Sequence, residues 1–282
     1  MMMEYGRLLI VATPIGNLAD ITLRAIDTLA NVDVIAAEDT RHTVKLLNHY
    51  EIKNKLISFH EYSNEARFED VLTYLRAGKD VALVSDAGTP VISDPGHELV
   101  RRCAAEGIAV ESIPGACAAI SAVAVSGMDC SHFVFWGFLN AKSAARKKEL
   151  ERIAEIGLPC VIYESPNRIL KTLGDVCSVC GEETQVCICR EITKLHEETL
   201  RTTARGAIDV FESREAIKGE FAVVLYPLDS VAAEMTEEDI TKELEKLIKG
   251  GSTKKTAAAD VAIKYKLPKN AVYKTALKID DN

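Results

Sequence analysis

Short apolar runs alternate with amphipathic segments over the first 113 residues of the chain. The runs have the length and β-branched content of strands buried on both faces, and the segments between them place apolar residues three and four positions apart. A βαβα order of this kind predicts a mainly parallel sheet with helices on both faces. The expected strands are Leu8–Ala12, Asp33–Ala37, Lys55–Phe59, Asp80–Ser85 and Ala109–Ile113, and the expected helices are Asp20–Leu29 with Asp20 as N-cap, 39–50, Glu65–Ala77 and Glu98–Glu106.

A second α/β pattern follows a helix of small residues that we expect over Pro114–Gly127, between a Pro-Gly start and a Gly stop. We expect this helix to bridge two domains. Spacings typical of hairpins near 186–203 indicate a more antiparallel sheet than the first. The second set of expected strands is Phe133–Trp136, Cys160–Tyr163, Val186–Arg190 and Phe221–Leu225, with helices at about 143–156, 166–180 and 204–216.

The last part of the chain predicts a small helical tail behind an acidic linker, Glu234–Asp239, with helices at 239–249, 253–265 and 268–279. From Ser252 to Ile279 there are seven lysines and one acid, a net charge of +6. Two short helices carrying lysines resemble a helix-turn-helix module, so we favour contact with nucleic acid over a merely solvated tail. The predicted division is an N-terminal α/β domain at 1–116, a second α/β domain at 117–230 and a basic helical tail at 236–282.

Composition narrows the class of protein. The 282 residues carry a formal net charge of −8, which argues against nonspecific nucleic-acid binding by the whole surface. No apolar stretch is long enough for a membrane span and the start lacks a signal-peptide pattern, so a cytoplasmic protein without membrane contact is expected. Four of the eight cysteines form the pairs Cys177/Cys180 and Cys187/Cys189. The second pair lacks the two-residue spacer of zinc ribbons, so we interpret them as reduced core thiols and predict no metal site.

Two strand ends carry the strongest indication of a binding site. The runs ending in Thr13-Pro-Ile-Gly-Asn17 and Asp86-Ala-Gly-Thr-Pro90 should face one crevice, because ligands of open parallel sheets bind beyond the carboxyl ends of the strands. Neither loop has the glycine fingerprint of dinucleotide sites or the lysine of a P-loop. A pocket lined by backbone and apolar walls suits S-adenosylmethionine, with its purine, ribose and zwitterionic tail, although the pattern by itself leaves simple tight turns as the alternative.

Seven motifs spread along the chain resemble the tetrapyrrole-methylase-like superfamily and, within it, the bacterial ribosomal RNA small subunit methyltransferase I family. The resemblance covers nearly the whole chain, including the lysine-rich tail. The motifs are TPIGNLADIT (13–22), AEDTRHT (37–43), LVSDAGTPVISDPG (83–96), PGACAAISAVAVSGM (114–128), YESPNR (163–168), REITK (190–194) and KGEFAVVL (218–225).

The resemblance implies a two-domain α/β enzyme, a homodimer, which uses S-adenosylmethionine to methylate the 2′-oxygen of a cytidine in the decoding region of small-subunit (16S) ribosomal RNA. Its substrate would be that RNA or the assembled 30S particle. Two departures from the small-molecule members, Gly88-Thr89-Pro90 in place of Gly-Asp-Pro and a first loop with less glycine, point away from tetrapyrroles. By motif, the cofactor-binding residues would be Ile15, Gly16, Asp86, Ala87, Gly88, Thr89, Ile92, Cys117, Ala118, Tyr163, Phe221 and Ala222.

The implied reaction is an in-line displacement on an already activated methyl group, so the enzyme would contribute mainly alignment and desolvation, and a general base would serve to remove the hydroxyl proton. No catalytic base stands out. The candidates are Glu38, Asp39, Arg41, Glu164 and Arg168, although Asp39 has the position of a helix cap and His42 that of a surface helix residue. The candidates for RNA contact are Arg41, Arg168, Arg190, Lys194, Lys254, Lys255, Lys269 and Lys274.

Two other interpretations are compatible with the sequence. A relative of the same superfamily could methylate a tetrapyrrole, a precorrin or a modified protein side chain, but the basic tail would then have no role. A non-enzymatic regulator could sense a ligand with its α/β part and bind nucleic acid with its tail.

Overall fold

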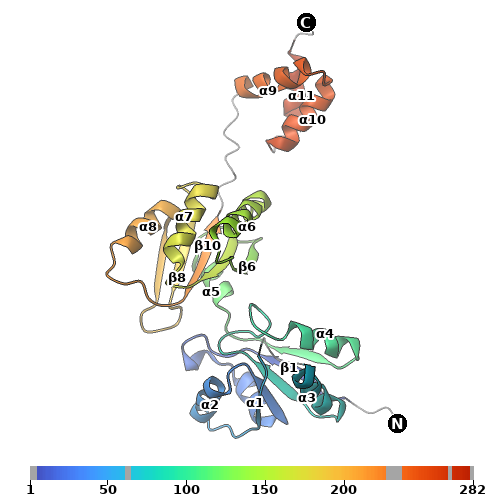
Figure 1. The fold of residues 1–282 in the computed structure, drawn as a ribbon, viewed down its shortest axis with the longest axis vertical. Helices are drawn as coiled ribbons and strands as arrows, with labels where there is room; N and C mark the ends of the chain where they lie inside the picture. The colour runs from blue at the N-terminus through green and yellow to red at the C-terminus, as the bar shows by residue number, and fades with distance from the viewer. Residues whose placement is uncertain (1–4, 61–64, 227–236, 266–268, 280–282) are drawn as a thin grey trace. The chain divides into compact units, whose positions relative to one another are not determined.

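The computed structural model of the chain describes residues 5–60, 65–226, 237–265 and 269–279 (Figure 1). The chain forms two compact units, a large one made of residues 1–153 and 158–227 and a small one that contains residues 228–282. The large unit holds two five-stranded sheets, here called with their helices the first lobe and the second lobe. The predicted boundary at residue 116 falls between the last strand of the first sheet and the helix that follows, and the domain limits stay a prediction.

The first sheet is entirely parallel, in the order β3-β2-β4-β1-β5. Every residue of β1, β2 and β4 is buried, which explains why these strands are continuous apolar runs rather than alternating ones. The strands are β1 (Leu8–Val11), β2 (Val34–Ala37), β3 (Leu56–Ser58), β4 (Val81–Val84) and β5 (Val110–Ile113).

Helices cover both faces of this sheet, as the βαβα pattern predicts. Leu8, Val34 and Leu83 pack in one cluster with α3 (Glu65–Arg76) and α4 (His97–Ala105), and residues one position along each strand pack in another with α1 and α2. The second pair of helices spans Leu23–Asn31 and Thr40–His49. The doubly wound α/β arrangement of the first lobe is therefore confirmed.

The second sheet is mixed, in the order β6-β7-β10-β8-β9. β6 and β7 are parallel, while β10 is antiparallel to β7 and to β8, and β8 is antiparallel to β9. This confirms the expected antiparallel character and adds β9, which the sequence indicated only as hairpin spacing. The strands are β6 (Val134–Phe138), β7 (Cys160–Glu164), β8 (Gln185–Arg190), β9 (Glu198–Thr203) and β10 (Phe221–Tyr226).

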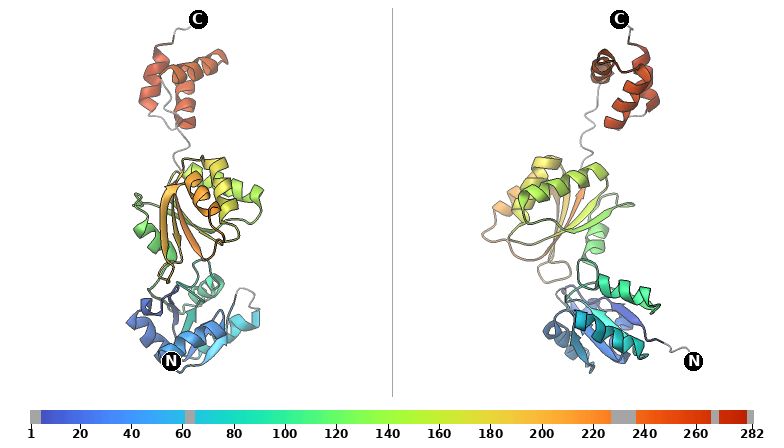
Figure 2. Two further views of the ribbon diagram at one scale, coloured as in Figure 1. Left: turned by 90° about the vertical axis from the view of Figure 1, so that its left-hand side faces the viewer. Right: turned by 45° about the vertical axis from the view of Figure 1, so that its right-hand side comes forward.

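Three helices cover one face of the second sheet and a single helix covers the other (Figure 2). The three are α6 (Ser143–Ile156), α7 (Ile169–Cys180) and α8 (Ala204–Glu212), and the single one is α5 (Ala118–Val125). Cys187 and Cys189 belong to the cluster under α5, whereas Cys177 and Cys180 pack against the opposite cluster. The two cysteine pairs lie on opposite faces of the sheet, so they cannot share one ion.

The described residues of the small unit form three helices, α9 (Glu237–Lys249), α10 (Lys254–Lys264) and α11 (Lys269–Leu277). They pack around a core of alanine, valine and leucine that includes Leu244, Val261 and Val272. The break between the predicted helices 253–265 and 268–279 and most of the predicted linker lie outside the described residues. Among the helices that the structure describes, none is both long and apolar enough to cross a membrane.

Three local predictions are wrong at helix starts. Asp20 ends a short 3-10 helix, Leu18–Asp20, and the N-cap of α1 is Thr22, whose side chain accepts from the Ala25 amide at 3.1 Å. The small-residue helix begins at Ala118 rather than Pro114, because Cys117 is still extended. The acidic residues Glu237–Asp239, expected in a linker, form the first turn of α9, where the helix dipole stabilises negative charge.

Candidate active site

The two loops singled out by their Gly and Pro residues lie side by side at the carboxyl edge of the first sheet. The amide of Thr13 donates to the carbonyl of Gly88 at 2.8 Å, and the amide of Gly88 donates back to Thr13 at 3.0 Å. The loop after β2 joins them, because the Asp39 amide donates to the Asp86 carboxylate at 3.1 Å. Parallel strands end at one edge, so three separate motifs meet there.

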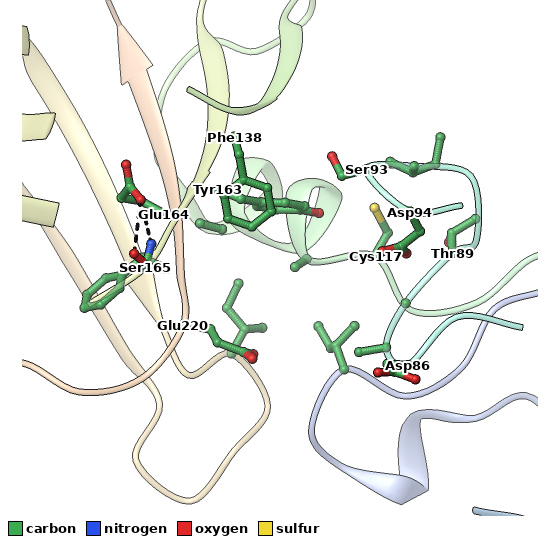
Figure 3. A pocket seen from close by; sticks show the side chains of 18 of the residues that line it. Asp86, Thr89, Ser93, Asp94, Cys117, Phe138, Tyr163, Glu164, Ser165 and Glu220 are labelled. Carbon is green, nitrogen blue, oxygen red and sulfur yellow. Dashed lines mark hydrogen bonds between the residues drawn. The ribbon is translucent and has the colours of Figure 1, made fainter. Parts of the chain in front are cut away.

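The second lobe faces this edge with strand ends of both directions. β7 ends at Tyr163 and Glu164, β8 runs into Glu191, and the antiparallel β10 starts at Phe221. Together the two lobes enclose a cavity of about 440 Å³ (Figure 3). Eleven of the twelve residues expected to bind the cofactor line it: Ile15, Asp86, Ala87, Gly88, Thr89, Ile92, Cys117, Ala118, Tyr163, Phe221 and Ala222.

The twelfth residue, Gly16, lies where the lobes touch. A Cβ on Gly16 would come within 2.4 Å of Lys194 Cγ in the second lobe. Next to this contact, the Thr193 hydroxyl donates to the Asp20 carboxylate. A second contact between the lobes pairs Ser93 with Gly137, where an added Cβ would lie 2.8 Å from Ser93 Oγ. These glycines let the two lobes approach closely.

Backbone strain is concentrated in two segments beside the cavity, residues 91–93 of the first lobe and residues 191–193 of the second lobe. Five non-glycine residues have positive φ among those that the structure describes, and four of them lie at Val91, Ser93, Glu191 and Thr193. A left-handed conformation is rare for such residues and costs on the order of 1–3 kcal/mol each. Such strain persists where the surrounding structure holds a functional loop in place.

Aromatic rings form the wall contributed by the second lobe. The Tyr163 ring lies 5.1 Å from that of Phe135 and 5.7 Å from that of Phe138, both edge-on. The Tyr163 hydroxyl accepts from the Ala119 amide at 3.1 Å, and burial raises the pKa of Tyr163 to about 12. Its hydroxyl therefore stays protonated at neutral pH.

Carboxylates dominate the charge of the cavity lining, which among its described residues holds six acids and one lysine. That lysine, Lys194, donates to Glu191 and Glu220 at 2.9 Å each. Burial, with help from the charge of Asp86, raises the pKa of Asp94 above its ordinary value, although a hydrogen bond from Ser85 opposes the rise. An acid-lined cavity of this kind favours a cationic ligand.

The candidate Glu164 is a buried anchor. Its carboxylate accepts from the Thr172 hydroxyl at 2.6 Å and the Ser165 amide at 2.8 Å, and it lies 3.2 Å from Arg168 Nε. Arg168 in turn donates to the Leu139 carbonyl at 2.6 Å. These bonds tie the ends of β6 and β7 together, so the observed geometry of both residues is one of positioning.

The other polar candidates are spread over both units. Asp39 caps α2 through the Arg41 amide at 2.8 Å and pairs with the exposed Arg41 side chain, while Glu38 lines the cavity. His42 is an exposed residue of α2. Arg190 pairs with Glu198 across β8 and β9 at 2.9 Å. The tail lysines Lys254, Lys255, Lys269 and Lys274 lie on α10 and α11 of the small unit.

Sequence reasoning missed several residues of the cavity lining. Ser93 and Asp94 stand inside the quoted motif 83–96, and Ser165 and Pro166 inside YESPNR, so the motif boundaries themselves were a usable signal. No such sequence signal exists for Phe138, because its orientation depends on a shift of register between β6 and β7. The remaining additions are Glu191, Ile192, Lys194 and Glu220; of these, only Lys194 had been named, as an RNA contact.

Comparison with solved structures agrees with this architecture. A cobalt precorrin-4 methyltransferase of cobalamin biosynthesis superposes with a TM-score of 0.58 at 18% identity, over 79% of this chain and 96% of the other. A uroporphyrin-III C-methyltransferase from Thermus thermophilus, complexed with S-adenyl homocysteine, gives 0.56 at 16% identity, over 78% and 97%. At these identities the likeness concerns the fold alone.

Sequence comparison is more specific. Residues 7–207 match the family described as Tetrapyrrole (Corrin/Porphyrin) Methylases. Proteins named ribosomal RNA small subunit methyltransferase I are 44% identical in Synechocystis, over 98% of this chain and 99% of the relative, and 46% identical in Haemophilus influenzae, over 96% of each. The Thermotoga maritima protein of that name is 50% identical over 78% of this chain and 98% of its own length. The chain therefore belongs to the tetrapyrrole methylase family and, within it, to the ribosomal RNA small subunit methyltransferase I family.

Proposed function

We propose that this protein transfers a methyl group from S-adenosylmethionine to the 2′-oxygen of a cytidine in the decoding region of small-subunit ribosomal RNA. One observation carries the proposal: residues from five separate motifs, expected to bind the cofactor, line one cavity between the two lobes. The names of the relatives support ribosomal RNA as the substrate over a tetrapyrrole. The two motif departures at residues 13–17 and 88–90 agree with that choice.

The lining suits S-adenosylmethionine. Gly88 lines the cavity with φ +84°, and a Cβ added there would lie 3.3 Å from Cγ2 of Ile15, another lining residue, so a side chain at Gly88 would crowd the wall of the site. Ile15, Ile92 and Phe221 supply apolar walls for a purine, and the acidic lining favours the positive sulfonium and ammonium groups. The bound cofactor supplies an activated methyl group, and the uroporphyrin-III methyltransferase of the same fold holds S-adenyl homocysteine.

The residues of this chain contribute orientation, exclusion of water and a place for the proton. The contacts of Ser93 with Gly137 and of Gly16 with Lys194 join the two lobes beside the cavity. Exclusion of water by the bound cofactor and substrate strengthens the electrostatic interactions inside it. The carboxylates of Glu38 and Asp94 line the cavity, and either can hold the proton that leaves the ribose hydroxyl. The raised pKa of Asp94 makes its carboxylate a stronger base than an exposed aspartate.

RNA contact is assigned to cations of both units. Lys194 at the cavity, Arg41 on the surface of the first lobe and the lysines of the small unit can position phosphates without reading sequence. We further propose that the enzyme is a homodimer, that it acts in the cytoplasm, and that its substrate is small-subunit ribosomal RNA or the assembled small subunit.

A methyl-transfer assay tests the function. Purified protein is incubated with tritiated S-adenosylmethionine and small ribosomal subunits from cells that lack the enzyme, with naked RNA and uroporphyrinogen in parallel. Label on the RNA, located by mass spectrometry to a ribose 2′-oxygen, is the expected result. Label on uroporphyrinogen alone would favour the small-molecule alternative, and the absence of label on every ribosomal substrate would reject the proposal. Sedimentation of the same preparation measures the oligomeric state.

A further inference from the structure

Phe138 occupies an unusual place for a phenylalanine. It is the last residue of β6 and is 57% exposed, yet its ring lines the cavity. Figure 3 shows this ring beside that of Tyr163, with Ser93 and Asp94 across the cavity on the first lobe. Large aromatic rings are normally buried in the core or in an interface, so a half-exposed ring at a site calls for a partner.

A β-bulge puts the ring there. Val134 and Trp136 pack on the face covered by α6, α7 and α8, and regular alternation would send residue 138 to the same face. The register between β6 and β7 shifts between Phe135 and Gly137, so Phe138 instead pairs with Tyr163 and lies against its ring. Bulges often re-aim a side chain next to an active site.

The surrounding structure holds this arrangement in place. Gly137 has φ +76° and carries no side chain where Ser93 of the first lobe approaches. The carbonyl of Leu139, one residue after Phe138, accepts from Arg168 at 2.6 Å, and Arg168 is anchored by the buried Glu164. The ring is therefore preorganised at the rim of the cavity before any ligand arrives.

The proposed substrate identifies the partner, and this inference rests on the proposed function. A ribose hydroxyl can reach a cavity recessed between two lobes only if its nucleotide leaves the stack of neighbouring bases. Unstacked bases of RNA are commonly held on aromatic side chains. We propose that Phe138 stacks on the base of the target nucleotide while its ribose enters the cavity, so that Phe138 is a substrate-binding residue.

The first test distinguishes a contact of Phe138 with the RNA from a contact with the cofactor. Phe138→Ala should raise the KM for unmethylated small subunits about tenfold, the size expected for one lost base–aromatic stack. The affinity for S-adenosylmethionine, measured by calorimetry, should stay within twofold of wild type. Phe138→Tyr and Phe138→Trp keep an aromatic face and should retain a near wild-type KM, whereas Phe138→Leu, which is apolar but has no such face, should behave like Phe138→Ala. Tyr5→Ala, another exposed aromatic residue (41%), is the matched control.

Two results would contradict the stacking of Phe138 on the target base. A loss of cofactor affinity in Phe138→Ala as large as the change in KM would place the ring against the cofactor and overturn the inference, as would a Phe138→Leu enzyme equal to wild type. If the wild-type enzyme labels no ribosomal substrate, the proposed function fails. A measurement of RNA binding then tests separately whether Phe138 stacks on a base. Single-stranded RNA should then quench the emission of Phe138→Trp more than that of wild type, whose one tryptophan is Trp136; equal quenching rejects the stack.

Discussion

The two lobes build their halves of the cavity in different ways. In the first lobe all strands are parallel, so the loops after β1, β2 and β4 meet at one edge. In the second lobe, the edge of the sheet that faces the cavity holds the ends of β6, β7 and β8 and the start of β10. A mixed sheet therefore brings together residues that stand at opposite ends of their strands.

This difference decides how each half tolerates change. The first lobe contributes loop backbone, as at Gly88, whose φ of +84° favours glycine and where an added Cβ would lie 3.3 Å from Ile15. The second lobe contributes side chains, among them Tyr163 and Phe138, which are held by ion pairs at the strand ends. We expect substitutions in the first lobe to abolish binding directly and substitutions in the second lobe to act mainly through stability or through single contacts.

The largest expected effect is that of Gly88→Val in the first lobe. A β-branched side chain at φ +84° is strained, and its Cβ would start 3.3 Å from Ile15 inside the cavity. We expect affinity for S-adenosylmethionine to fall more than about a hundredfold, which is about 3 kcal/mol. Calorimetry measures it.

Gly107→Val is the matched control for this change. Gly107 has φ +73° with open space around its Cβ position, so the substitution adds the same backbone strain away from the cavity. Both variants should lose thermal stability, and only Gly88→Val should lose cofactor binding. An unchanged affinity in Gly88→Val would reject the placement of the cofactor against this loop.

The second effect concerns the stability of the second lobe. Glu198 on β9 pairs with Arg214 and with Arg190 on β8, and chiefly the hydrogen bond from Arg214 lowers the pKa of Glu198 from 4.5 to about 2. A carboxylate whose pKa is lower in the folded state stabilises the fold above its unfolded pKa, and this contribution is lost as the pH falls from about 4.5 toward 2. Allowing for solvent screening, Glu198→Gln should lower the free energy of unfolding by about 2 kcal/mol at pH 7.

Urea titrations at several pH values check this prediction. The difference between wild type and Glu198→Gln should shrink as the pH falls through the interval from 4.5 to 2. The affinity for S-adenosylmethionine at pH 7 should not change, since Glu198 does not line the cavity. A pH-independent difference in stability would show that the ion pairs are not its source.

The smallest effect tests whether either lobe needs the small unit. The Thermotoga maritima relative matches 78% of this chain with 98% of its own length, so about a fifth of this chain, close to the length of residues 228–282, has no counterpart in it. Truncation after Leu228 should leave cofactor binding intact and weaken RNA binding about tenfold, with a flatter dependence on salt because phosphate contacts are lost. RNA affinity and salt slope that survive the truncation would make the tail a solvated appendage.

Much of the first lobe could be predicted from local signals. Fully buried parallel strands are continuous apolar runs, and their ends carry Gly and Pro where the site is. Capping was less predictable: Asp39 caps α2 as expected, but Thr22 rather than Asp20 caps α1, because the chain first makes a 3-10 turn that brings Asp20 to Thr193. That contact crosses between the lobes, and no local pattern encodes it.

Local signals in the amino-acid sequence predicted most of the strands and helices, the family and most of the residues that meet at the cavity, because periodicity and motifs are local properties of the chain. The three-dimensional arrangement of the chain is needed to show that Glu164 and Arg168 anchor strand ends, that the two cysteine pairs lie on opposite faces of a sheet, and that Phe138 is directed into the cavity. Those outcomes depend on which strands are neighbours and on one shift of register, and both are settled by packing between segments far apart in the chain.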